Sequence, residues 1–271
     1  MDSNRKKILV IMGSPRKGNT FRACEEIHGI MEQNFPVEFE YLWLKDVQLL
    51  PCKGCLACFT QGEERCPNHD DASLIAQKML DADGVIFATP VYGLSVTGPM
   101  KVFIDRFSYN FHRPRFFDKK ALLLTTTGFI GHKDVTKYLY TVARIWGFEV
   151  AGKAALVTPI PLPDYRMRQN QRTVAQAAGE YVSSLKRTVR KKPGLTDVII
   201  FHGQRAAFSR LETLSPADYR YWKEQGWLSG SVHYFTNVPV NPLYRVIGMI
   251  VERISARQVR KDLPLDSGAV Q

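Results

Sequence analysis

The chain has 271 residues, of which 45% are hydrophobic and 23% charged, and its formal net charge at pH 7 is +11. This composition is that of an ordinary globular protein and excludes a disordered or collagen-like chain. No apolar run reaches the roughly 18 residues that a membrane-spanning helix needs, and the polar first residues lack a signal-peptide pattern. We therefore expect a cytoplasmic protein with no transmembrane segment.

The excess of positive charge is confined to the second half of the chain. Residues 121–271 carry 21 of the 37 Lys and Arg and 11 of the 26 Asp and Glu, a net charge of +10. Basic surfaces attract nucleic acid, anionic lipid or acidic proteins. Because these basic residues are not interleaved with a known nucleic-acid-binding motif, we interpret them as a solvated face and expect no nucleic-acid partner.

Apolar runs alternate with helical patterns along the first 190 residues. An uninterrupted apolar run, such as that at residues 8–12, is typical of a strand covered on both faces in a parallel sheet. Five strands are predicted, at residues 8–12, 37–44, 84–90, 121–125 and 149–158. Five helices are predicted at residues 19–32, 71–80, 99–107, 133–146 and 172–190. This alternation predicts an α/β fold with a doubly wound sheet.

The functional loops of a doubly wound sheet lie at the carboxyl ends of its strands, here residues 13–20, 90–95 and 125–131. The first of these loops, Gly13-Ser-Pro-Arg-Lys-Gly-Asn-Thr20, precedes a helix whose N-terminal N–H groups suit a phosphate. The alternative is a turn in which the side chain of Asn19 or Thr20 only caps the helix. The loop matches neither a Walker motif nor the dinucleotide motif G-x-G-x-x-G.

The other two loops offer an aromatic ring and hydroxyl groups. Tyr92 follows Pro90 at the end of one strand, a position suited to a planar ligand, and three threonines precede Gly128 at the end of another. Each segment is also compatible with an ordinary surface turn.

Four of the five cysteines, Cys52, Cys55, Cys58 and Cys66, lie within residues 52–66, which we call the cysteine segment. In a reducing compartment such a cluster indicates metal binding or redox activity rather than a disulfide framework. Cys24, on the first predicted helix, is expected in the core.

Three motifs in this order, GSPRKGNT, ATPVYG followed by GPMKVFIDR, and the cysteine segment between them, resemble the flavodoxin-like NAD(P)H-dependent FMN reductases. Within that family the sequence is most similar to the iron–sulfur flavoprotein branch, over roughly residues 6–190. The resemblance implies a flavodoxin-like, five-stranded parallel sheet of order 2-1-3-4-5, with FMN as cofactor and NAD(P)H as co-substrate. It also implies a homodimer or homotetramer.

The resemblance assigns roles to individual residues. It places the FMN phosphate at Ser14, Arg16, Asn19 and Thr20, the isoalloxazine ring at Pro90, Val91, Tyr92 and Gly93, and a third FMN loop at Thr127 and Gly128. Lys101, Asp105 and Arg106 match the helix after the ring loop, where we expect a role in packing and assembly rather than in catalysis.

The cysteine spacing C-x2-C-x2-C-x7-C resembles the compact motif of iron–sulfur flavoproteins. Three thiols at two-residue gaps and a fourth further along suit a [4Fe–4S] cluster, whereas zinc usually takes two separated C-x-x-C pairs. Thiols without metal are a third alternative. His69 is expected on the surface rather than as a ligand.

The alternation stops near residue 192, which divides the chain into a predicted FMN-binding domain, residues 1–191, and a C-terminal extension, residues 192–271. The extension is aromatic-rich and basic, features that suit contact with another subunit or with a partner. The leading hypothesis is an oxidoreductase that passes electrons from NAD(P)H through FMN to an acceptor. The alternative is an electron carrier that links FMN, a [4Fe–4S] cluster and a protein partner such as a ferredoxin.

Overall fold

The computed structural model describes residues 5–262. Within these residues the chain divides into two compact units. The first contains the residues up to Gly54 together with Asn68–Val189, and the second contains Cys55–Pro67 together with the residues from Arg190 onward. Most of the cysteine segment therefore belongs to the same unit as the C-terminal residues.

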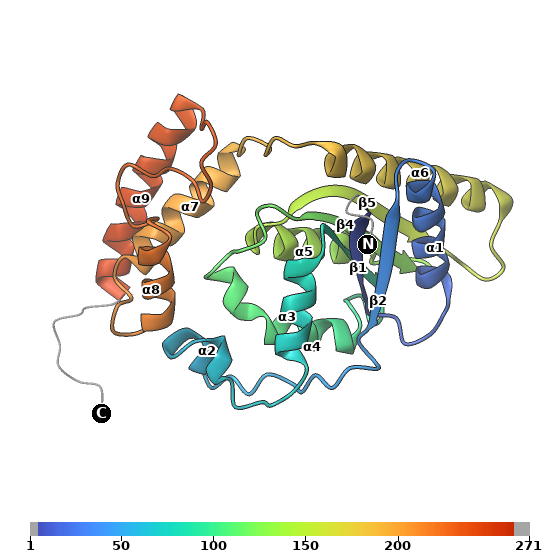
Figure 1. Ribbon diagram of the computed structural model, residues 1–271, viewed down its shortest axis with the longest axis horizontal. Coiled ribbons are helices and arrows are strands. Elements are labelled where there is room, and N and C mark those ends of the chain that lie inside the picture. The colour runs from blue at the N-terminus through green and yellow to red at the C-terminus, as the bar shows by residue number, and fades with distance from the viewer. Residues whose placement is uncertain (1–4, 263–271) are drawn as a thin grey trace. The chain divides into compact units, whose positions relative to one another are not determined.

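The first unit is built on a five-stranded parallel sheet of order β2-β1-β3-β4-β5 (Figure 1). The strands are β1 (Lys6–Met12), β2 (Val37–Trp43), β3 (Gly84–Pro90), β4 (Lys120–Thr127) and β5 (Glu149–Val157). The predicted fold class and strand order are both confirmed. Because β1 pairs with β2 on one side and with β3 on the other, the order of strand addition reverses at β1. Ligands of such folds bind at this reversal.

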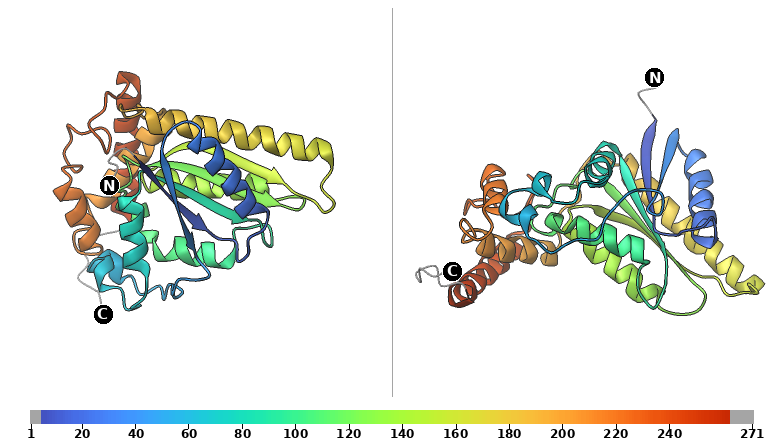
Figure 2. Two further views of the ribbon diagram at one scale, coloured as in Figure 1. Left: turned by 45° about the vertical axis from the view of Figure 1, so that its right-hand side comes forward. Right: turned by 90° about the horizontal axis from the view of Figure 1, so that it is seen from below.

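Helices cover both faces of the sheet, which explains why its central strands are buried along most of their length (Figure 2). On one face α1 (Asn19–Glu32) and α6 (Asp164–Lys186) form a single core with the sheet, and Cys24 is fully buried in it, as predicted. The other helices of this unit are α3 (Ala72–Asp81), α4 (Gly98–Arg106), α5 (His132–Ile145) and the short η2 (Ser108–Phe111). Their face holds an aromatic cluster in which the ring of Phe103 lies 6.4 Å from that of Phe87 and 5.7 Å from that of Trp146.

The predicted start of the last helix of the first unit was wrong. It begins at Asp164, not at residue 172. Residues 164–171 are polar except for Tyr165 and Met167, and both of these side chains are exposed. The first two turns of the helix therefore carry no buried apolar stripe, which is the signal that locates an amphipathic helix in a sequence.

The second unit is helical. It contains α2 (Ala57–Thr60), η1 (Glu63–Arg65), α7 (Leu195–Phe208), α8 (Pro216–Glu224) and α9 (Pro242–Asp262). Its aromatic side chains form a core: Trp222 is fully buried, and its ring centroid lies 5.0 Å from that of Phe208. The short helix α2 contacts α8, and the Ser215 hydroxyl donates a hydrogen bond to the carbonyl of Phe59 at 3.2 Å.

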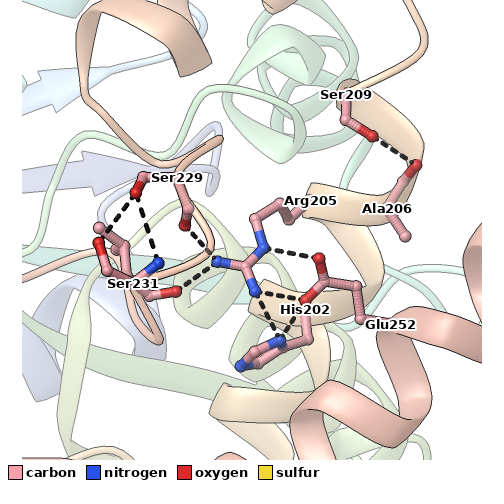
Figure 3. A network of polar contacts seen from close by, with 8 residues as sticks. His202, Arg205, Ala206, Ser209, Ser229, Ser231 and Glu252 are labelled. Carbon is pink, nitrogen blue, oxygen red and sulfur yellow. Dashed lines mark hydrogen bonds and ion pairs between the residues drawn. The ribbon is translucent and has the colours of Figure 1, made fainter.

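A partly buried polar network joins α7 to α9 (Figure 3). Glu252 on α9 contacts Nδ1 of His202 at 2.6 Å and accepts a hydrogen bond from Nε of Arg205 at 2.9 Å. Burial lowers the pKa of His202, and the nearby Arg205 lowers it further, while the hydrogen bond to Glu252 opposes this shift. Gly248 allows α9 to approach this closely, because a Cβ at that position would overlap the His202 ring.

The face of α9 that points away from α7 is apolar and exposed. Leu243, Val246, Met249, Ile250 and Ile254 each expose at least 39% of their surface. None of the helices in the described part of the chain combines the length and hydrophobicity needed to span a membrane.

Candidate active site

An open cavity of about 510 Å³ lies at the carboxyl edge of the sheet in the first unit, which is within the usual size range of ligand pockets. It is lined by Ser14, Arg16, Gly18, Asn19, Thr20, Pro90, Val91, Tyr92, Thr126, Thr127, Gly128, Thr158, Pro159 and Ile160. Nine of the ten residues assigned to FMN from the sequence line this one cavity. Gly93, the tenth, is not among the lining residues and instead lies in the turn of the loop after β3.

The loop after β1 presents the N-terminus of α1 to the cavity. The buried Ser14 hydroxyl turns the loop by donating to the carbonyl of Arg16 at 2.9 Å. The N-cap of α1 is Gly18, and no side chain caps the helix, so the capping role considered for Asn19 or Thr20 is not observed. The first turn of α1 also contains no acidic residue. Since an α-helix leaves its first N–H groups without intrahelical partners, this end of α1 is suited to an anion.

Hydroxyl groups connect this loop to the neighbouring strand ends. Thr20 and Thr126 are both buried, and their Oγ1 atoms lie 2.7 Å apart. The Thr97 hydroxyl, at the N-cap of α4, donates to the carbonyl of Gly13 at 2.8 Å. These bonds hold the loop after β1 in a fixed position relative to β4 and α4.

The loop after β3 presents Tyr92 on a tight turn. Gly93 and Leu94 both have positive φ, at 54° and 63°, and Tyr92 and Ser95 exchange two backbone hydrogen bonds of 3.0 Å. A two-residue turn with two left-handed residues favours glycine, which explains the use of Gly93. The Tyr92 side chain remains 46% exposed at the rim of the cavity.

Sequence reasoning missed the contribution of the loop after β5. Thr158, Pro159 and Ile160 line the cavity, and the backbone N–H of Thr158 donates to the carbonyl of Thr127 at 2.7 Å. Gly18 and Thr126 were also not singled out, although they lie inside loops that were. The signal for all of them was available, because the end of a fifth parallel strand must reach the same edge of the sheet as the others.

Among the residues that line the cavity, Arg16 is the charged one. Its side chain is exposed. Burial lowers the pKa of His132, the first residue of α5, and the positive charges of Lys133 and Arg166 lower it further. The positive charge of Arg16 favours an anionic ligand in the cavity.

The residues of the cavity fit a ligand with a phosphate and a flat ring. The uncapped helix suits the phosphate, and Tyr92 offers an aromatic surface. At Gly128 a Cβ would meet no atom within 4 Å, so the backbone there faces open space that a ring can approach. FMN has both of these parts.

The cysteine segment contains two short helices. Cys58 lies on α2, and Cys66 is the C-cap of η1. None of the five cysteines forms a disulfide, and within the described residues no three His, Cys, Asp or Glu side chains are assembled around a metal position. The donor set nevertheless suits iron or iron–sulfur ligation. One backbone donor, the N–H of Gly54, already lies 3.4 Å from the sulfur of Cys52. His69 is exposed, as predicted.

Comparison with known proteins gives consistent results. The family model described as NADPH-dependent FMN reductase matches residues 6–160. The chain is 29% identical over 226 residues to an iron–sulfur flavoprotein of Archaeoglobus fulgidus, covering 82% of this chain and 100% of that protein. It is 40% identical over 102 residues to an iron–sulfur flavoprotein of Methanocaldococcus jannaschii, covering 37% of this chain and only 51% of that protein. The crystal structure of an azoreductase from Bacillus anthracis matches with a TM-score of 0.51 and 17% identity, over 66% of this chain and 99% of that chain, which supports the fold alone.

Proposed function

The chain belongs to the family of NADPH-dependent FMN reductases, and we propose that it binds FMN in the cavity of the first unit and transfers electrons from NAD(P)H through FMN to an acceptor. When bound, FMN supplies the chemistry, because its ring accepts a hydride and passes two electrons on. The protein supplies binding, orientation and electrostatics.

The observation that carries this proposal is the uncapped N-terminus of α1 inside the cavity. Its free N–H groups and partial positive charge favour a phosphate monoester. Asn19 and Arg16 add a polar and a charged side chain at the same place. The ring would then lie toward Tyr92 and the backbone at Gly128, and the exposed rim leaves one side accessible to NAD(P)H. In this arrangement no side chain needs to act as a general acid.

The proposal is tested by comparing flavins. The purified protein should bind FMN more tightly than riboflavin or FAD, as measured by flavin fluorescence, because only FMN ends in a phosphate monoester. With FMN bound it should oxidise NADPH or NADH in the presence of a non-specific acceptor such as ferricyanide. Equal affinities for FMN and riboflavin would contradict the assignment of the phosphate loop.

The second candidate function is an electron carrier in which the four cysteines, Cys52, Cys55, Cys58 and Cys66, hold a [4Fe–4S] cluster. It is favoured by the thiol spacing and by the names of the relatives, which are iron–sulfur flavoproteins. When bound, such a cluster exchanges single electrons. The acceptor would then be a protein such as a ferredoxin, whose acidic surface would complement the basic C-terminal residues.

Iron analysis separates the two functions. Protein prepared without oxygen should contain about four irons and four sulfides per chain. Replacing Cys55 with Ser should abolish both while FMN stays bound, and His69→Gln, at an exposed position nearby, serves as the control. If metal-free protein has full reductase activity and Cys55→Ser does not change it, the result would reject the electron carrier and support an FMN reductase without a cluster. One zinc per chain would make the segment structural.

We also propose that the protein acts in the cytoplasm as a homodimer or homotetramer. Two exposed apolar surfaces support self-association. One is the stripe on α9, and the other surrounds the cavity, where Leu94, Phe129 and Ile160 expose 62%, 79% and 95% of their surface. Large exposed apolar patches mark interaction sites in soluble proteins.

A further inference from the structure

The two ends of the cysteine segment are joined to each other within the first unit. The backbone N–H of Gln48 donates to the carboxylate of Asp71 at 2.8 Å, and the N–H of Asp71 donates to the carbonyl of Gln48 at 2.9 Å. Three residues further in, the amide of Asn68 donates to the carbonyl of Pro51 at 2.9 Å. Residues 48–51 and 68–71 therefore form a closed base from which the cysteine segment extends.

A buried ion pair lies at the centre of this base. Nη1 and Nη2 of Arg106 contact the two carboxylate oxygens of Asp70 at 2.5 and 3.1 Å, and Nη1 also donates to the carbonyl of Leu50 at 2.9 Å. The side chains of Arg106 and Asp70 are 3% and 0% exposed. Burial alone would raise the pKa of Asp70, but hydrogen bonds from Arg106, Leu50 and Ala72 keep it below its ordinary value. Asp70 therefore stays ionised, and a paired buried carboxylate of this kind fixes its partners firmly.

The helix α4, which carries Arg106, also contacts the loop after β1. The helix α4 begins after Thr97, whose hydroxyl bonds to Gly13 at the start of the phosphate loop, and it ends at Arg106. It has 9 residues and is therefore about 13 Å long. One helix thus contacts the loop after β1 through its N-cap residue and the base of the cysteine segment through its last residue.

From these contacts we infer that Arg106, together with Asp70, is a positioning residue that fixes the two ends of the cysteine segment one helix length from the FMN loops. The inference rests on the proposed function of the cysteines. Bringing the ends of a flexible segment together has an entropic cost. Because the ion pair holds the two ends of the segment together before any metal binds, less conformational entropy is lost when the thiols bind a metal.

The experiment uses the full-length protein, reconstituted with ferrous iron and sulfide in the absence of oxygen. The variants Arg106→Lys and Asp70→Asn each remove the two-pronged contact. The matched control is Lys101→Gln, which breaks an exposed ion pair with Asp105, of 2.6 Å, on the same helix. We expect a chelator to remove iron at least about tenfold faster from both variants than from the control, since a charge-assisted hydrogen bond is worth about that factor or more. FMN affinity should change less than about twofold.

A second measurement does not depend on metal. Hydrogen exchange at the backbone N–H groups of Leu50 and Asp71 should be at least about tenfold faster in both variants, while exchange in β1 stays at the wild-type rate. If Arg106→Lys does not fold, the isosteric Asp70→Asn alone carries the comparison.

The outcomes separate this inference from the proposed function. If the wild type takes up iron and the variants release it at the control rate, the inference is overturned and the proposed function stands. If the wild type takes up no iron, the proposal for the cysteines fails, and hydrogen exchange alone decides the inference. In that case the inference is overturned if the N–H groups of Leu50 and Asp71 exchange as slowly in the variants as in the control. Faster exchange in the variants supports the inference.

Discussion

The hydroxyl groups of Thr20 and Thr126 lie 2.7 Å apart, although 106 residues separate them in the chain. Thr20 is in the first turn of α1, and Thr126 is near the end of β4. Their hydrogen bond connects the proposed phosphate loop to the strand whose following loop is proposed to contact the ring. The two parts of the cavity are thereby held at a fixed separation before a ligand binds.

Replacing Thr126 with Val should therefore weaken FMN binding. Loss of one buried hydrogen bond costs about 0.5–1.5 kcal/mol, which corresponds to an increase in Kd of roughly 2- to 13-fold. The matched control is Thr125→Val, because the Thr125 hydroxyl forms the same kind of pair with Thr136, also at 2.7 Å, and does not line the cavity. That variant should lose stability in urea unfolding but keep its FMN affinity. Equal effects of both variants on Kd would contradict the assignment.

Replacing Asn19 with Asp should change stability and FMN affinity in opposite directions. A negative charge in the first turn of a helix stabilises the helix by about 0.3–1 kcal/mol, so the protein without flavin should melt at a higher temperature. The same charge repels a phosphate, so FMN should bind more weakly while riboflavin binding stays unchanged. Calorimetry and fluorescence titration measure the two effects. A parallel loss of affinity for both flavins would place the effect at the ring instead.

Replacing Tyr92 with Ala should weaken FMN binding without unfolding the protein, because the side chain is nearly half exposed. An aromatic contact is worth about 0.5–1.5 kcal/mol in addition to the buried area. Tyr92→Phe keeps the ring and should retain most of the affinity. Wild-type affinity and redox potential in the Ala variant would show that Tyr92 does not contact the flavin.

The central strands of the sheet could be predicted from the sequence because β1, β3 and β4 contain short, continuous apolar runs that indicate burial on both faces. The edge strand β2 is different, because two glutamates interrupt its apolar residues. The cavity could be predicted in large part because the carboxyl ends of parallel strands must meet. The helices α2 and η1 could not, since four residues at Ala57–Thr60 are too few to show a period. The Arg106–Asp70 pair was also missed. Its partners lie 36 residues apart, and nothing in the local sequence shows that Arg106 is buried.

The His202 network should make the second unit sensitive to acid. The pKa of His202 is lower in the folded protein than in the unfolded chain, so the unfolded chain binds a proton first as the pH falls. Stability is therefore complete above the unfolded pKa of about 6.5 and decreases as the pH falls through it, by at most about 1.4 kcal/mol per pH unit. Urea unfolding between about pH 7.5 and pH 5.5 should show this slope, and His202→Gln should reduce it. His69→Gln, at an exposed position, is the control.

The exposed stripe of α9 should contribute to self-association. Replacing Ile250 and Ile254 with Glu puts charges on a face that exposes 51% and 60% of these side chains, so folding should be preserved. If the stripe is an interface, light scattering should show a smaller assembly, because an unpaired charge is costly to bury. Glu in place of Arg253, an exposed residue between them, is the control for the change in charge. An unchanged mass would contradict a role of the α9 stripe in self-association and would favour the patch around the cavity.

The hydrogen bond between Ser215 and the carbonyl of Phe59 joins residues 156 positions apart. At a synthesis rate of about 5–20 residues per second, roughly 8–30 s separate the translation of the cysteine segment from that of α8, its packing partner. During this interval Cys55, Cys58 and Cys66 belong to a nascent chain that lacks the helices of their own unit. Any metal or oxidant that reaches these thiols on the ribosome therefore meets a segment that the C-terminal helices have not yet shaped.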